Sequence, residues 1–83
     1  AEGFSEFIRG IDGVEIAFCI TETRDRYKIS FRSSGTYTIN DVAALFGGGG
    51  HFFAAGCRIK KEDLKETINI ILTECDRKIN NGN

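Results

Sequence analysis

The sequence predicts a mixed α/β to α+β domain, in which helices pack on a small mixed sheet in the order α-β-β-α-β-α. Three observations support this class. Two runs of alternating apolar residues follow one another, a short polar connector separates them, and an amphipathic segment closes the chain. The 83 residues suffice for a single domain, residues 1–83, and the 41% of apolar residues can supply one modest core.

The first half of the chain predicts a helix and a hairpin. Residues 2–11 place Phe and Ile side chains at helical spacing, and Asp12-Gly13 ends this segment, so we expect a short helix there. The runs VEIAFCITE (14–22) and YKISFRSS (27–34) alternate with a period of two, and four polar residues connect them. This pattern predicts two antiparallel strands.

The second half predicts a helix, a glycine loop, a strand and a long helix. Asn40 is a candidate N-cap for a short helix, which must stop at Gly47 because four glycines cannot sustain it. The segment AAGCRIK (54–60) is a candidate third strand. Residues 62–79 have the strongest amphipathic pattern, and their acidic start and basic end suit the helix dipole. The tail NNGN is expected to fray.

Charge and cysteine content exclude several classes of function. The net charge is −1, so bulk electrostatics does not predict nucleic-acid binding, and any phosphate recognition must be local. Cys19, Cys57 and Cys75 match no zinc spacing, and their odd number argues against a complete disulfide framework. We expect them to be buried thiols in a reducing cytoplasm. No apolar run approaches membrane-spanning length and no signal peptide is apparent, so no membrane partner is expected.

The most unusual stretch is FGGGGHFFAAG, in which Gly47, Gly48, Gly49 and Gly50 precede His51, the single histidine of the chain. Backbone N–H groups of glycines can converge on an anion, and an imidazole can donate to a phosphate oxygen or a sugar hydroxyl. The run is neither a Walker loop nor a dinucleotide fingerprint, since no Gly-Lys-Ser/Thr follows it and a helix precedes it. A flexible linker beside an ordinary histidine explains the local pattern equally well, but apolar residues at both ends favour a shaped loop.

Arg32 is the second candidate for ligand binding. It lies on the polar face of the second predicted strand, in SFRSSG. A guanidinium suits bidentate recognition of phosphate. For an isolated strand arginine, a solvated surface charge is the commoner role. Ser33 and Ser34 beside it either donate hydrogen bonds or simply form the turn.

Taken in order, DGVEIAF, KISFRSSG, FGGGGH and AAG before a terminal amphipathic helix resemble the C-terminal DHH-associated domain of DHH-family phosphoesterases. The resemblance extends from about Gly13 to Ile79, and it is closest to the RecJ-like, NrnA-type oligoribonuclease and 3′-phosphoadenosine-5′-phosphate phosphatase branch. Its most specific part is GGGH followed by AAG, with an arginine on the preceding strand. The resemblance implies that Gly48 to His51 form the substrate loop and that Gly47 is the extra glycine that often precedes it. It also implies that Arg32 binds a phosphate group of the substrate.

The resemblance further implies a C-terminal substrate-binding domain that is not catalytic alone. In such enzymes an N-terminal DHH domain of the same chain holds divalent metals, usually manganese, which activate water against a phosphoester. The implied ligands are short RNA or DNA or a phosphorylated nucleotide, and the parent enzyme could be a homodimer. This sequence has no DHH triplet, and one histidine with scattered carboxylates cannot build a two-metal centre, so no cofactor is expected in it. The chain begins AEGFSE and has no Met, which suggests a piece of a larger protein, although removal of an initiator Met or a tag gives the same appearance.

Several alternatives stay open at this point. A cyclic-dinucleotide phosphodiesterase and a RecJ-like single-strand exonuclease would share the loop, and a non-catalytic nucleotide-binding module would need no partner domain. The C-terminal oligomerisation domain of alanyl-tRNA synthetase fits less well, because its loop lacks the order GGGH then AAG. The chain departs from the family pattern at Phe52 and Phe53, where basic or polar residues are frequent. One ring could stack on a base, and at least one is expected to pack beneath the loop.

Overall fold

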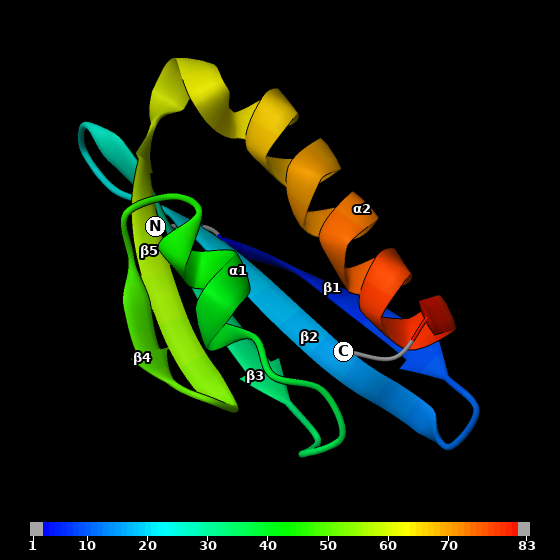
Figure 1. Ribbon diagram of the computed structural model, residues 1–83. Helices are drawn as coiled ribbons and strands as arrows, with labels where there is room; N and C mark the ends of the chain where they lie inside the picture. The colour runs from blue at the N-terminus through cyan, green and yellow to red at the C-terminus, as the bar shows by residue number, and fades with distance from the viewer. Residues whose placement is uncertain (1–2, 82–83) are drawn as a thin grey trace.

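A computed structural model describes residues 3–81 as one five-stranded sheet with both helices on one of its faces (Figure 1). The strand order is β1-β2-β3-β5-β4, so β5 lies between β3 and β4. Every neighbouring pair is antiparallel, which gives an antiparallel rather than a mixed sheet. The α+β class and the packing of helices on the sheet are confirmed. The elements are β1 (Gly3–Gly10), β2 (Gly13–Glu22), β3 (Arg26–Ser33), α1 (Asn40–Ala44), β4 (Gly49–His51), β5 (Ala54–Lys60), a 3₁₀ turn (Lys61–Asp63) and α2 (Leu64–Asn81).

The predicted helix over residues 2–11 is wrong, because the described part of this segment is strand β1 paired with β2. Gly10 pairs with Gly13 across a two-residue turn, and Gly13 has a φ of +106°. Asp12-Gly13 is therefore a hairpin signal and does not end a helix. The apolar spacing misleads because Phe4 and Phe7 are exposed and form no buried helical stripe.

The other predicted elements are confirmed, with changes at their ends. The predicted strands correspond to β2, β3 and β5, and the two later helices correspond to α1 and α2. Ile39, not Asn40, occupies the N-cap of α1, and no side chain caps that helix. The helix α2 continues through Asn81, so the first half of the NNGN tail is helical and does not fray, while residues 82–83 lie outside the described part. No helix within residues 3–81 is long and apolar enough to cross a membrane.

The core lies between the helices and the face of the sheet that they cover. Phe18 and Phe31, on neighbouring strands, are fully buried, with ring centroids 6.2 Å apart. Burying each such ring contributes about 1.5–3 kcal/mol to stability. Burial raises the pKa of Cys57 and Cys75 to about 11, so both are neutral thiols at physiological pH, as expected of buried cysteines. Cys19 is only half-buried, so the expectation of a buried thiol is wrong for this residue.

Candidate functional site: the glycine edge and the open sheet face

The first two glycines of the run end α1. The Gly47 N–H donates to the Ala44 carbonyl at 3.1 Å, and the Gly48 N–H donates to the Ala43 carbonyl at 3.0 Å. Gly47 has a φ of +79°. This combination is a Schellman ending, in which a left-handed glycine closes the helix. Both amides are therefore occupied inside the fold, which corrects the expectation that all four glycine amides could converge on an anion.

Gly48 and Gly50 must be glycine because a side chain at either position would overlap β5. A Cβ atom on Gly48 would lie 2.1 Å from the carbonyl oxygen of Gly56 and 2.6 Å from Cβ of Cys57, both on β5. Gly50 has a φ of +145°, and a Cβ atom there would lie 2.7 Å from the carbonyl oxygen of Ala54. Glycine is thus needed here for the close packing of the run on β5.

Neither close packing nor a positive φ requires glycine at position 49. A Cβ atom on it would meet no atom within 4 Å, and its φ is not positive. It belongs to β4, a three-residue edge strand that the sequence analysis missed, and it pairs with Gly56. It is also exposed. Since nothing in residues 3–81 excludes a side chain there, the bare backbone at Gly49 leaves room for close approach from outside the chain.

The sheet register brings His51 and Arg32 into one row. Ala54 pairs with Arg32 on β3 and with His51 on β4. The two candidates therefore flank Ala54, two strand spacings or about 10 Å apart. Opposed residues of antiparallel strands project to the same face. Both side chains are exposed, and Arg32 Nη1 donates one hydrogen bond to the Phe31 carbonyl at 2.9 Å, which uses one of five guanidinium donors.

Both helices cover one face of the sheet (Figure 1), and the alternation of buried residues along β3 places this row on the opposite face. Along β3, Ile29 and Phe31 are fully buried beneath the helices, whereas the alternating positions Lys28, Ser30 and Arg32 point the other way. A cavity of about 300 Å³ opens between the start of the glycine run and β5. We call the helix-free side the open face. It is defined by Lys28, Ser30 and Arg32 of β3 and by the residues that pair with them across the sheet.

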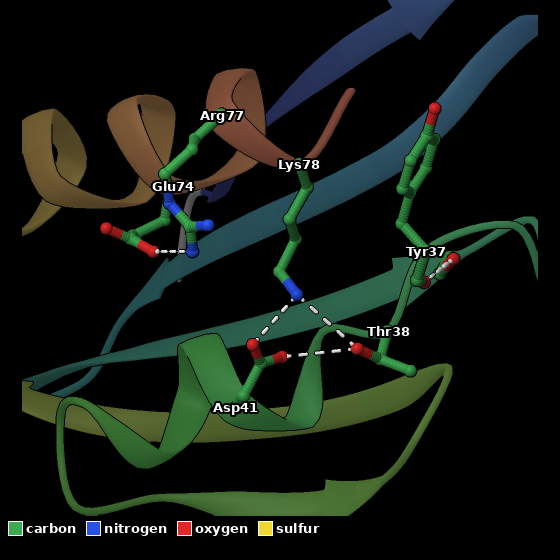
Figure 2. Close-up of polar contacts among 7 residues, drawn as sticks. Tyr37, Thr38, Asp41, Glu74, Arg77 and Lys78 are labelled. Carbon is green, nitrogen blue, oxygen red and sulfur yellow. Dashed lines mark hydrogen bonds and ion pairs between the residues drawn. The ribbon is translucent and has the colours of Figure 1, made fainter. Parts of the chain in front are cut away.

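An ion pair between the buried Lys78 and the exposed Asp41 holds α1, and with it the start of the glycine run, against α2 (Figure 2). Lys78 Nζ lies 2.8 Å from Asp41 Oδ2 and donates to Thr38 Oγ1 at 3.4 Å, and the Lys78 side chain is only 3% exposed. Tyr37 donates to the Ile79 carbonyl at 3.4 Å. Burial of the Asp41 carboxyl opposes its ionisation, but the hydrogen bond and charge of Lys78, together with hydrogen bonds from the backbone N–H groups of Asp41 and Val42, outweigh burial, so the pKa of Asp41 lies below its ordinary value.

The sequence analysis missed this ion pair. Lys78 follows Cys75 by three residues on the buried stripe of α2, where a charged residue is unusual. A lysine on the apolar stripe is a signal that could have predicted an acidic partner on another element.

The tip of the β4–β5 hairpin exposes two aromatic rings beside His51. Phe52 is 64% exposed and Phe53 is 42% exposed, and the rings meet edge to face with centroids 6.3 Å apart. The expectation that at least one of them packs beneath the loop is wrong. Their carbonyls accept hydrogen bonds from the Ile39 and Ser33 N–H groups, at 2.8 and 2.9 Å, so the backbone of the tip is anchored while the rings stay outside.

The fold and the site together define a class of domain. It is an α+β unit with both helices on one face of an antiparallel sheet, and one edge strand of that sheet consists of glycine and histidine. The DHHA1 domain model matches residues 2–77, and the chain belongs to this family. The resemblance to the C-terminal domain of DHH-family phosphoesterases is thereby confirmed.

Two curated relatives share the name "Bifunctional oligoribonuclease and PAP phosphatase NrnA". The protein from Thermus thermophilus is 31% identical over 72 residues, which cover 87% of this chain and 22% of the relative. The protein from Mycoplasma pneumoniae is 36% identical over 62 residues, which cover 75% of this chain and 18% of the relative. The chain thus spans about a fifth of the length of these relatives.

Proposed function

We propose that this chain is the substrate-binding domain of a larger DHH-family phosphoesterase that hydrolyses short oligonucleotides or 3′-phosphoadenosine 5′-phosphate. In this proposal Arg32 binds a phosphate group through two guanidinium N–H donors, and His51 donates to a phosphate oxygen or a sugar hydroxyl. The glycine segment, Gly47 to Gly50, lets the ligand approach the backbone. The reacting phosphoester is positioned here, while the groups that activate water lie in another domain of the parent.

The observation that carries the proposal is the unfilled space next to the backbone of Gly49, close to the row that contains Arg32 and His51. A positive φ at Gly47 and close contacts at Gly48 and Gly50 account for the other glycines of the run, but neither accounts for Gly49. Two side chains that suit phosphate stand on the same open face. The names of the curated relatives support a phosphorylated nucleotide or a short oligonucleotide as ligand.

The metal centre that the family resemblance implies lies, in this proposal, in the DHH domain of the parent. Within residues 3–81 no group of three or more His, Cys, Asp or Glu side chains could hold a metal ion. No metal-dependent step is therefore assigned to this chain. Its own residues bind and orient the ligand, and we expect no hydrolysis by the chain alone.

Titration with 3′-phosphoadenosine 5′-phosphate tests the proposal. We expect weak binding, with amide shifts in NMR spectra concentrated at Gly49, His51 and Arg32. Arg32→Ala and His51→Ala should each weaken binding about tenfold or more, since a hydrogen bond to a charged group contributes about 1.5–3 kcal/mol. Arg77→Ala, which removes an exposed arginine of α2, is the matched control. Shifts confined to α2, or equal affinity in all variants, would refute the proposal.

Gly49→Ala separates binding from folding. Because a methyl group at position 49 meets nothing in the chain, the thermal unfolding temperature should stay within a few degrees of the original. The same methyl group would stand between the backbone and the ligand, so affinity for 3′-phosphoadenosine 5′-phosphate should fall about tenfold, and Gly49→Val should lower it further. Unchanged affinity in both variants, with the fold intact, would show that the ligand does not approach the backbone at this point.

A further inference from the structure

A row of small residues crosses the open face from one edge of the sheet to the other. The strand pairings place one small residue of every strand in this row, which we call the trough. Its members are Gly49, Gly56, Ser30, Cys19 and Ser5. The row spans four strand spacings, or about 19 Å. Because none of these side chains is large, the middle of the open face is low along its whole width.

Cations border the trough on both sides. Arg32 and His51 stand on one side, and Lys28 and Arg58 on the other. The two borders are four residues apart along the strands, or about 13 Å. Lys28 and Arg58 face each other directly across β3 and β5, an arrangement of like charges that destabilises a sheet. Among residues 3–81 neither has a carboxylate partner, whereas Lys61, Arg77 and Lys78 each do.

The open face is hollowed beside Lys28 and Arg58 and, separately, beside Arg32. The cavity of about 300 Å³ has Lys28 and Arg58 in its wall, together with Gly48 and Gly56. A second cavity of about 230 Å³ lies over β1, β2 and β3, with Ser5, Ser30 and Arg32 in its wall, and it does not reach His51. The hollows thus lie on either side of the row that runs through Ser30 and Gly56. An anion at the first cavity would relieve the repulsion between its two unpaired cations.

We infer that Lys28 and Arg58 form a second phosphate subsite, and that the open face recognises a nucleoside that carries phosphate on both its 5′ and its 3′ oxygen. One phosphate lies at Arg32 and His51, the second lies at Lys28 and Arg58, and the nucleoside crosses the trough between them. This unit is common to 3′-phosphoadenosine 5′-phosphate and to an oligonucleotide. The inference rests on the proposed function and specifies the chemistry that it selects.

Comparison of one-phosphate and two-phosphate ligands tests the subsite. We expect the chain to bind 3′-phosphoadenosine 5′-phosphate about tenfold or more tightly than adenosine 5′-monophosphate, since the second phosphate gains charge-assisted hydrogen bonds. The double variant Lys28→Ala/Arg58→Ala should abolish this preference and leave the affinity for the monophosphate within about twofold, because it removes only the second subsite. The dinucleotide pApA should behave like the bisphosphate.

The control Lys65→Ala/Arg77→Ala removes the same charge from exposed positions of α2 and should preserve the preference. Equal affinity of the original chain for the two ligands would overturn the inference. A double variant at Lys28 and Arg58 that weakens both ligands equally would also overturn it, since that result indicates a general electrostatic effect. If 3′-phosphoadenosine 5′-phosphate instead binds without dependence on Arg32 or His51, the proposed function itself fails, and the two failures are thereby distinguished.

Discussion

Gly48→Ala is expected to lower the free energy of unfolding by about 3 kcal/mol or more, because the added methyl group has nowhere to go. It would stand 2.1 Å from the Gly56 carbonyl oxygen and 2.6 Å from Cβ of Cys57. These atoms belong to the backbone and the base of a side chain, so rotation of a flexible group cannot relieve the overlap. Either the glycine segment or β5 must move, and β5 lies between two other strands.

Thermal and urea unfolding measure this effect. For a domain of this size the unfolding temperature should fall by more than about 10 °C. Gly49→Ala is the matched control, since it adds the same methyl group one residue away, where no atom lies within 4 Å. An unfolding temperature of Gly48→Ala within about 2 °C of the original would mean that the segment does not pack on β5 as described.

Asp41→Ala is expected to lower the free energy of unfolding by about 1–3 kcal/mol, because it leaves a buried ammonium without its counter-charge. Lys78 is 3% exposed, and after the substitution its remaining neighbour would be Thr38 Oγ1 at 3.4 Å. Lys78→Met should be less harmful, since it removes the buried charge and leaves Asp41, which is 55% exposed, to water. Asp76→Ala, at an exposed position of α2, is the control for loss of a helical carboxylate.

The pH dependence of these variants has a defined sign. The pKa of Asp41 is lowered in the folded chain, so the ion pair stabilises the fold above the carboxyl's unfolded pKa. This contribution is lost as the pH falls through the lowered value. The stability difference between the original chain and Asp41→Ala should therefore be largest near neutral pH and shrink in acid. A difference that persists unchanged at pH 2, or Lys78→Met as damaging as Asp41→Ala, would contradict the role of the pair.

The strands that the sequence predicts are those with one buried face. β2, β3 and β5 alternate between core and open positions, so their period is visible in the residue types. β1 lies at the sheet edge and is mostly exposed, so its apolar residues follow no burial pattern and mimic a helix. β4 has almost no side chains, and only its pairing with β5 makes it a strand. An edge strand is held in its extended conformation by pairing with the next strand, and the local sequence pattern does not show this pairing.

The residues of the candidate site can be selected from the sequence, but their arrangement in space cannot. A glycine run beside a single histidine is unusual enough to be selected from the sequence, and a strand arginine is a natural partner. Which glycines serve packing and which leave space depends on contacts with β5, about eight residues further on. The opposition of Lys28 and Arg58 depends on a register between strands thirty residues apart. Neither relation is visible before the strands are paired.

The anchoring of the glycine segment at both ends has an energetic consequence for any ligand. Four free glycines would lose much conformational entropy on complex formation, but here the hydrogen bonds to α1 and the pairing with β5 have already restricted them during folding. Most of the entropy cost of ordering these glycines therefore falls on folding and does not reduce the affinity for a ligand. The segment is expected to unfold together with the rest of the domain. Saturating ligand should raise the melting temperature of the whole unit by mass action, with no separate transition for the segment.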